Sequence, residues 1–142
     1  VINLQAVQNF IEQVRSLGVR IALDDFGAGY SNFRYAMDLH ADVIKIDGSI
    51  VKNICHSTES HAVITAIVGL AHDLGCKCVA EWVEDLHTLR EVKELGVDYV
   101  QGYLVSPAVE CERFLNLNST LELMPDQNRA RLVQSVLESV SA

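Results

Sequence analysis

The residues best suited to chemistry follow four short apolar segments, with one polar residue or pair after each. These polar residues are Asp24 and Asp25, Lys45 and Asp47, Glu81 and Glu84, and Gln101. If the apolar segments are parallel strands, their carboxyl ends meet at one edge of the sheet. Since all four segments end in polar side chains and three of them carry charge, we expect a shared functional rim at that edge.

Among the five carboxylates in this set, those of Asp24, Asp25 and Glu81 would repel one another if they stood unpaired. Asp24 and Asp25 are adjacent, and Glu81 comes from a different segment. Mg²⁺ or Mn²⁺ would relieve that repulsion, because hard divalent cations prefer carboxylate oxygens. Lys45 adds a positive charge that could hold a water or steady a phosphate oxygen. Two cations a few ångströms apart are a recurring arrangement for phosphodiester hydrolysis.

The geometry of the Asp pair depends on where its strand ends. In a regular strand Asp24 and Asp25 point to opposite faces, so both reach one site only at the strand terminus. The segment that follows, residues 26–30, contains two glycines, which permit a sharp turn or a mobile loop over the site.

Other reactive residue types give weaker signals. The five histidines are scattered over predicted helices and loops, which indicates structural or solvated roles. Cys76 and Cys78 would point to the same face of a strand, and we interpret them as buried thiols rather than as a zinc site. Trp82 is interpreted as a packing residue rather than as a stacking platform. Gly27 and Gly29 lack the third glycine of a dinucleotide-binding fingerprint.

The elements that would position these residues follow a repeated pattern. A Leu-Gly step, or Leu-His in one copy, precedes each apolar segment, at residues 17–18, 39–40, 74–75 and 95–96. Glycine is a common residue just after a helix, so each copy predicts a helix end followed by a short strand.

Amphipathic spacing predicts helices before and between the strands. The predicted helices cover 3–17, 31–39, 58–74 and 86–95. Alternating helices and strands predict a parallel sheet of right-handed β-α-β units, arranged either as a (β/α) barrel or as a doubly wound sheet. The strands are nearly all apolar, which is typical of parallel strands covered on both faces.

Two parts of the chain differ in character. Residues 1–115 carry the strand and helix repeat, whereas residues 116–142 form a helical tail. Within this tail we predict a helix over Asp126–Ser139, which either docks on the first part or pairs with another chain.

Composition excludes several classes of function. The chain has 142 residues, 49% of them hydrophobic, with a net charge of −8 and a pI of about 5.0. This acidic balance argues against DNA, RNA or an anionic membrane surface as a partner. No apolar run reaches the roughly 18 residues of a membrane span, and the first ten residues lack the basic start of a signal peptide. We therefore expect a cytoplasmic segment without membrane contact, in a parent protein that could itself be membrane-anchored.

Taken in order, the four polar segments resemble the signature of EAL domains, the bacterial cyclic di-GMP phosphodiesterases. The matching motifs are Asp24-Asp25-Phe26-Gly27-Ala28-Gly29-Tyr30-Ser31, Lys45-Ile46-Asp47-Gly48-Ser49, Ala80-Glu81-Trp82-Val83-Glu84 and Gln101-Gly102-Tyr103. The resemblance covers about residues 1–109. It implies a TIM-like (β/α)8 barrel, of which this chain would supply the parallel strands five to eight. It also implies a two-metal site that opens cyclic di-GMP to linear pGpG.

The same resemblance implies a role for each polar residue. Asp24 would bridge both metal ions, while Asp25 and Glu81 would bind the second, so these three are the expected metal ligands. Lys45 would contact the attacking water, and it forms the expected catalytic group together with Asp25 and Glu81. The expected substrate-binding residues are Gln101, Glu84 and Asp47.

The departures from the family pattern concern mainly what the chain lacks. No Glu-Ala-Leu occurs in it, and the Asn and further Glu ligands of the barrel's first half have no counterpart. A whole barrel has about 250 residues, so roughly 100 would precede this segment. Ala28 and Trp82 stand where Thr and Gly are more usual, and neither replacement predicts inactivation.

Three hypotheses follow for the chain. In the first, it is part of a metal-dependent cyclic di-GMP phosphodiesterase and is inactive without the N-terminal half of the barrel. In the second, it is a degenerate module that binds cyclic di-GMP or a protein partner without catalysis. In the third, it is a scaffold that dimerises through open sheet edges. The expected partners are cyclic di-GMP and either a second copy of the chain or the missing half. The preceding segment could carry a GGDEF or sensor domain.

Overall fold

The structure, a computed structural model, describes residues 3–29, 32–124 and 126–139. Its centre is a parallel sheet with the sequential strand order β1-β2-β3-β4. The strands are β1 (Ala22–Phe26), β2 (Val43–Ile46), β3 (Lys77–Ala80) and β4 (Tyr99–Val100). Sequential order is that of a (β/α) barrel, whereas the strand order of a doubly wound sheet reverses partway. The barrel alternative is therefore the one that this topology matches.

The helices predicted from spacing begin and end within one residue of the prediction. The helices are α1 (Leu4–Ser16), α2 (Asn32–Asp38), α3 (Gly48–Val51), α4 (Thr58–Asp73), α5 (Leu86–Glu94), α6 (Cys111–Leu115), the 3₁₀ turn η1 (Thr120–Leu123) and α7 (Gln127–Glu138). The spacing did not predict α3, α6 or η1, because each is too short to show a helical period.

The repeated Leu-Gly step ends the helices as predicted. Gly18, Gly75 and Gly96 follow α1, α4 and α5 with φ of 82°, 74° and 86°, a left-handed conformation that glycine adopts without strain. His40 takes the same place after α2, with φ of 48°. Each cap leads the chain directly into the next strand, so all four strands run in the same direction through the sheet.

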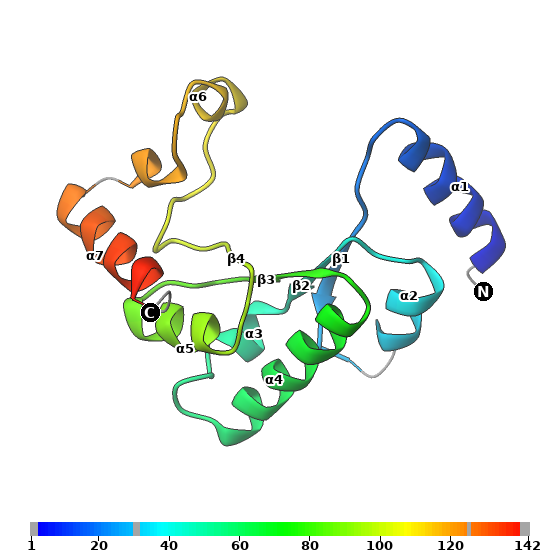
Figure 1. The fold of residues 1–142 in the computed structure, drawn as a ribbon, viewed down its shortest axis with the longest axis horizontal. Coiled ribbons are helices and arrows are strands. Elements are labelled where there is room, and N and C mark those ends of the chain that lie inside the picture. The colour runs from blue at the N-terminus through cyan, green and yellow to red at the C-terminus, as the bar shows by residue number, and fades with distance from the viewer. Residues whose placement is uncertain (1–2, 30–31, 125, 140–142) are drawn as a thin grey trace.

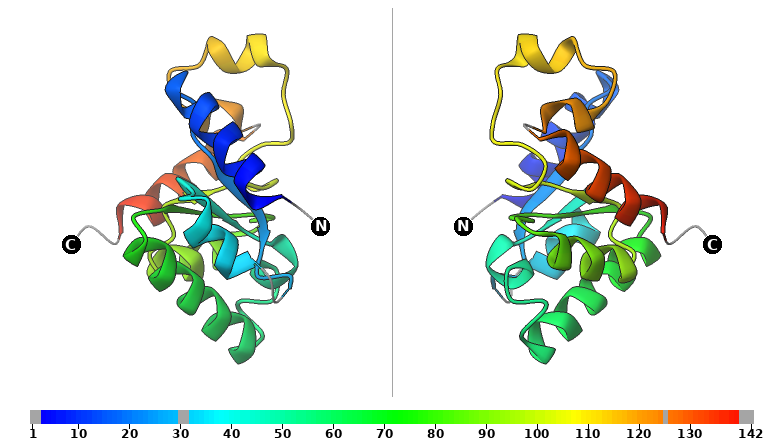
Figure 2. Two further views of the ribbon diagram at one scale, coloured as in Figure 1. Left: turned by 90° about the vertical axis from the view of Figure 1, so that its right-hand side faces the viewer. Right: turned by 90° about the vertical axis from the view of Figure 1, so that its left-hand side faces the viewer.

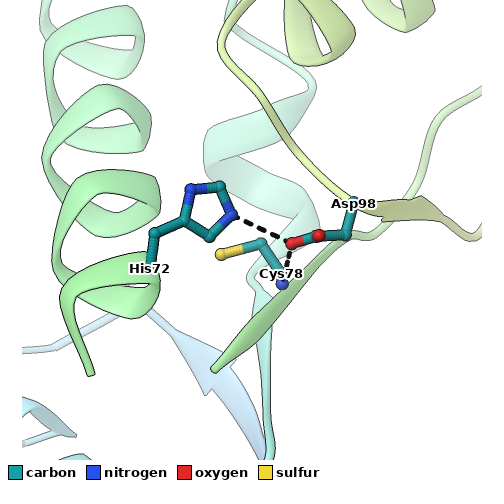
Figure 3. Close-up of side chains that lie close together, drawn as sticks. All are labelled: His72, Cys78 and Asp98. Carbon is teal, nitrogen blue, oxygen red and sulfur yellow. Dashed lines mark hydrogen bonds and ion pairs between the residues drawn. The ribbon is translucent and has the colours of Figure 1, made fainter. Parts of the chain in front are cut away.

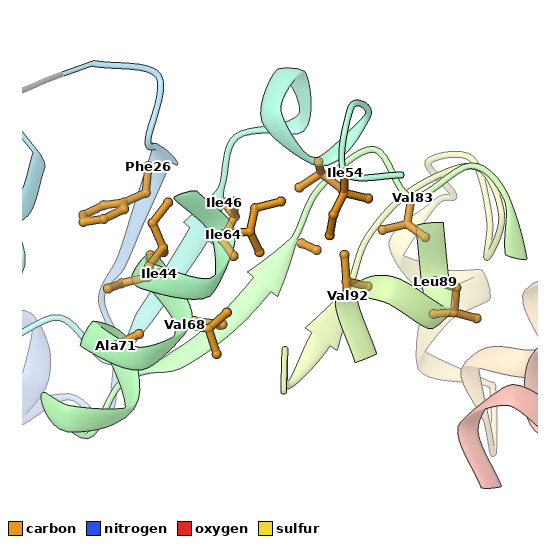
Figure 4. Packing of buried hydrophobic residues seen from close by; sticks show 14 of the residues in the cluster. Phe26, Ile44, Ile46, Ile54, Ile64, Val68, Ala71, Val83, Leu89 and Val92 are labelled. Atoms are coloured by element: carbon orange, nitrogen blue, oxygen red, sulfur yellow. The ribbon is translucent and has the colours of Figure 1, made fainter. Parts of the chain in front are cut away.

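One face of the sheet packs against helices and forms the core. Side chains alternate along β2 and β3, and Ile44, Ile46, Cys78 and Ala80 are fully buried. Both α4 and α5 lie on this side of the sheet (Figures 1 and 2), and α4 contacts β2 and β3. Figure 4 shows the apolar side chains of these elements packed together. Burying each large apolar side chain stabilises the fold by about 1.5–3 kcal/mol.

The opposite face of the sheet is less covered than its apolar composition predicts. Val43, Lys45 and Val79 alternate with the buried residues and remain half-buried. Within the described part of the chain, this face has no helical layer comparable to α4 and α5. In a closed barrel such a face lines the interior, which places Lys45 where a barrel would hold its functional groups.

The C-terminal helix docks on the rest of the chain. α7 packs on α5, and the two helices lie side by side in Figure 1. Lys93 of α5 donates hydrogen bonds to the carbonyls of Val136, at 2.7 Å, and Leu137, in the last turn of α7. Arg129 Nη2 donates to the carbonyl of Glu84 at 3.3 Å, which links α7 to the segment after β3. Of the two predicted arrangements, the structure shows docking within the chain.

The first helix lies at one end of the molecule, beside α2 (Figure 1). Arg15 Nη2 of α1 pairs with Asp42 Oδ2 at 3.0 Å, just before β2. Phe10 and Leu17 belong to the apolar stripe of this helix and remain exposed. Across the described ranges, neither α1 nor any other helix has the length and apolar character needed to cross a membrane.

Candidate functional site

A β-bulge in β1 brings two adjacent carboxylates to the same place. The register of β1 against β2 shifts between Leu23 and Phe26, so Asp24 and Asp25 together stand opposite the single residue Lys45. Asp25 has φ of 51°, a left-handed conformation that aspartate tolerates better than most residues. The sequence predicts that both carboxylates reach one site only where the strand ends, whereas the bulge brings them together within β1.

Lys45 lies between carboxylates from both neighbouring strands. Its Nζ is 2.7 Å from Asp24 Oδ1 in β1 and 2.6 Å from Glu81 Oε1, directly after β3. The Glu81 side chain is only 11% exposed, whereas the Asp24 side chain is 64% exposed. The structure therefore brings residues from three strands together at the carboxyl edge of the sheet, with one carboxylate held inside and another open to solvent.

These contacts keep the groups charged. The hydrogen bond from Lys45 is the main cause that lowers the pKa of Asp24, so this carboxylate is ionised at neutral pH. Burial alone would lower the pKa of Lys45, but its hydrogen bonds to Asp24 and Glu81 raise it. The ammonium group of Lys45 is therefore protonated at neutral pH and balances part of the negative charge around it.

The three carboxylates fit a divalent cation. One oxygen from each of Asp24, Asp25 and Glu81 lies within 4.8 Å of the other two. Two ligands on opposite sides of Mg²⁺ stand about 4 Å apart, since each Mg–O bond is about 2.1 Å. Three carboxylates and the one ammonium of Lys45 carry a formal charge of −2, which one divalent cation balances. An all-oxygen donor set suits Mg²⁺ or Mn²⁺ better than zinc or copper.

A pocket of about 850 Å³ is lined by residues that follow Glu81 and by the end of β4. Glu84 and Gln101, both predicted to bind substrate, are among its lining residues. Lys52 lines it as well and was not predicted, because it ends α3, a helix too short to show in the spacing. Trp82 also borders the pocket, although the sequence indicated a packing residue at this position.

Gln101 is fixed by the backbone of the neighbouring segment. Its N–H donates to the carbonyl of Ala80 at 2.9 Å, and its own carbonyl accepts from the N–H of Val83 at 3.1 Å. Gly102 permits this close approach, because a Cβ on it would lie 2.8 Å from the carbonyl carbon of Val83 and closer still to its nitrogen and oxygen. This part of the pocket lining therefore depends on glycine at position 102.

Asp47 has a structural role at the start of α3. Its Oδ1 accepts a hydrogen bond from the Ser49 N–H at 2.8 Å and another from the Ser49 hydroxyl. This N-cap explains an aspartate here without reference to a ligand, and substrate contact by Asp47 stays a prediction. Tyr30 and Ser31, which end the first sequence motif, lie outside the described residues.

A second group of metal-ligating residue types lies at the amino end of β3 (Figure 3). Asp98 Oδ2 is 3.0 Å from His72 Nε2 and accepts the Cys78 N–H at 2.9 Å, while Oδ1 is 2.6 Å from Lys77 Nζ. Burial, followed by the charges of Asp98 and Cys76, raises the pKa of the Cys78 thiol to about 12, whereas zinc binds the thiolate. We therefore interpret Asp98 as a structural link between α4, β3 and β4. This agrees with the predicted buried thiols.

Replacing Asp98 by asparagine is expected to destabilise the fold in a pH-dependent manner. Burial raises the pKa of Asp98, but Lys77, the Cys78 N–H and His72 together lower it below its usual value. A lowered folded-state pKa stabilises above the unfolded pKa of about 3.9, and this contribution is lost as the pH falls through the folded-state pKa. Urea unfolding of D98N should show a loss of about 1–2 kcal/mol at pH 7 and almost none near about pH 2. Equal losses at both pH values would contradict the link.

Comparison with known proteins identifies the family. The sequence model of the EAL domain family matches residues 1–108. The chain belongs to the EAL domain family. The resemblance read from the four motifs is thereby confirmed. Among curated relatives, cyclic di-GMP phosphodiesterase PdeF from Escherichia coli is 37% identical over 103 residues, which are 72% of this chain and 14% of that protein.

Solved structures of EAL proteins share the fold. An EAL domain protein from Listeria monocytogenes matches with a TM-score of 0.74 and 36% identity, over 80% of this chain and 46% of that one. BlrP1 from Klebsiella pneumoniae, a complex with manganese and cyclic di-GMP, matches with a TM-score of 0.67 and 34% identity, over 71% of this chain and 26% of that one. The chain thus spans less than half of each, and its four parallel strands are part of a TIM-like barrel.

Proposed function

We propose that this chain supplies part of the active site of a metal-dependent phosphodiesterase that hydrolyses cyclic di-GMP to pGpG. The observation that carries the proposal is the convergence of Asp24, Asp25 and Glu81 around Lys45. The relatives support it, because PdeF is named a cyclic di-GMP phosphodiesterase and the BlrP1 structure holds manganese with cyclic di-GMP.

The proposed chemistry assigns a task to each charged residue. Asp24, Asp25 and Glu81 hold Mg²⁺ or Mn²⁺, and cations bound there supply Lewis acidity toward the phosphodiester. Lys45 orients the attacking water or binds a phosphate oxygen, since its ammonium is charged and already lies among the carboxylates. The water oxygen bonds to phosphorus, the P–O3′ bond breaks, and a proton passes to the departing 3′ oxygen. One water thereby opens the ring to a linear dinucleotide.

The proposed substrate-binding residues surround the pocket after β3 and β4. Glu84 and Gln101 line it, and together they offer a carboxylate acceptor and an amide that both donates and accepts. Asp47, two residues beyond Lys45, is the third proposed contact. A volume of about 850 Å³ is in the range of small-molecule sites.

Two cations need more ligands than this group offers. Mg²⁺ prefers six oxygen ligands, whereas the described cluster provides three carboxylates. The sheet has β1 and β4 as its edges, and the matched Listeria chain is more than twice as long as the matched segment. We propose that the N-terminal half of a barrel, or a second copy of the chain, adds the remaining ligands and covers these edges.

The cysteines support a cytoplasmic location within this proposal. Cys55 and Cys111 are free and exposed, and Cys76 and Cys78 are free and buried. Free exposed thiols persist in a reducing compartment and are oxidised or paired elsewhere.

A chimera tests the proposal. Residues 1–108 of this chain replace the matching segment of Escherichia coli PdeF, so that the relative supplies the first half of the barrel. We expect Mn²⁺-dependent conversion of cyclic di-GMP to pGpG, followed by chromatography, and its loss in EDTA. The matched variant D24N in the same chimera should be inactive, because it removes a carboxylate from the cation group.

Two other results would change the conclusion. We expect no hydrolysis of cyclic di-GMP by the 142-residue chain alone. If this chain does hydrolyse it and D24N abolishes the activity, no further half of the barrel is needed. A chimera that binds cyclic di-GMP without hydrolysing it would contradict catalysis and favour a regulatory binding module.

A further inference from the structure

Trp82 occupies an unusual conformation beside the carboxylate group. It is the single tryptophan of the chain, it directly follows Glu81, and its φ is 56°. A left-handed backbone is strained for a bulky residue, and strain of this kind concentrates at functional sites. Trp82 is also 56% exposed, so deep burial of the indole does not offset the strain.

Gly48 makes room for the indole. A Cβ on Gly48 would lie 2.8 Å from Trp82 Cδ1 and closer still to Cγ and Cδ2. The ring therefore packs directly against the backbone at the start of α3. Any residue type other than glycine at position 48 would displace the ring. This contact fixes the ring in position, although more than half of the residue surface remains open.

The open part of Trp82 borders the pocket that holds the proposed substrate-binding residues. Glu84, Gln101 and Tyr103 line the same pocket, and Glu81 of the carboxylate group is the preceding residue. A fixed, exposed aromatic ring next to a carboxylate and an amide matches the needs of a guanine base. The ring offers a stacking surface, and the N1–H and N2 amino groups of guanine donate to a carboxylate such as that of Glu84.

We propose that Trp82 stacks on one guanine base of the ligand and so helps to select a guanine nucleotide. This inference rests on the proposed function and adds a base-recognition residue to it. Trp82 touches the base and not the reacting phosphate. Trp82 lines the pocket, and the contact with Gly48 holds the indole there.

The single tryptophan provides a direct readout. We titrate the chain with GMP and record both tryptophan emission and calorimetric heat, with ribose 5-phosphate as the ligand that lacks the base. Stacking predicts a saturable change in emission with GMP that follows the heat, and no change with ribose 5-phosphate.

Three substitutions separate stacking from a general effect on folding. W82G should weaken GMP binding about tenfold, within the range that alanine substitution gives for base–aromatic stacking, whereas W82F should stay within about threefold. W82G also relieves the positive φ, so its melting temperature should not fall with its affinity. Y99A removes an exposed aromatic ring at the start of β4, outside the pocket lining, and should bind GMP as the unchanged chain does.

The outcomes distinguish this inference from the function on which it rests. GMP binding by calorimetry without a change in emission, or with unchanged affinity in W82G, would overturn stacking and leave the proposed function intact. Absence of any GMP binding would overturn the nucleotide pocket, and with it the substrate part of the proposed function.

Discussion

Replacing Glu81 by glutamine in the chimera with PdeF is expected to abolish hydrolysis of cyclic di-GMP. Glu81 is the most buried of the three carboxylates, and its Oε1 forms an ion pair with Lys45 Nζ at 2.6 Å. Glutamine keeps the shape but removes the negative charge that would face the cations. Loss of a supporting group around a metal ligand costs roughly 10- to 100-fold, so loss of a ligand itself should cost more than about 100-fold in turnover. Chromatographic assay of pGpG formation with Mn²⁺ measures the effect.

The control for this substitution is Glu94, an exposed glutamate at the end of α5. E94Q makes the same chemical change far from the carboxylate group and should leave turnover unchanged. Turnover by E81Q at the rate of E94Q would show that Glu81 is not a cation ligand.

Replacing Gly102 by alanine is expected to destabilise the fold by about 3 kcal/mol, near the upper end for overpacking. The added Cβ would lie 2.8 Å from the carbonyl carbon of Val83, with the nitrogen and oxygen closer. These are backbone atoms, so the clash cannot be relieved by turning a side chain. Relief requires separating the two segments, which breaks the hydrogen bond between Val83 N–H and the Gln101 carbonyl. Urea unfolding measures the loss of stability, provided that the m-value is the same for G102A and the unchanged chain.

Gly69 provides the matched control for that experiment. It lies inside α4, and a Cβ there would meet no atom within 4 Å. G69A should raise stability by about 0.5–1 kcal/mol, because alanine is the better helix former. Destabilisation of similar size in both variants would contradict the argument from close approach.

The helices, caps and parallel strands could be predicted because their signals are local. The Leu-Gly steps at Gly18, Gly75 and Gly96 placed three helix ends, and the structure shows a left-handed glycine at each. Strand direction follows from these connections, so the meeting of Asp24 and Glu81 at one edge was also within reach of the sequence. The spacing alone did not decide between barrel and doubly wound order, because strand order depends on packing across the whole sheet. The resemblance to EAL domains implied the barrel, and the sequential strand order confirms it.

The features that the sequence could not predict depend on partners distant in the chain. The bulge that aligns Asp24 and Asp25 arises from pairing with β2, about twenty residues away. The Asp98 link depends on His72, which lies 26 residues earlier. Trp82 was interpreted as packing because its type alone favours burial, whereas its positive φ and its contact with Gly48 appear only in three dimensions.

The central claim is that acidic side chains from separate strands share divalent cations beside Lys45. Crystals of the chain grown with Mn²⁺ test it directly, because manganese can be located by its anomalous scattering. We expect an anomalous peak about 2.2 Å from carboxylate oxygens of Asp24, Asp25 and Glu81, and no peak in crystals of E81Q. A peak only at His72, Cys78 and Asp98, or no peak at the three carboxylates, would contradict the account.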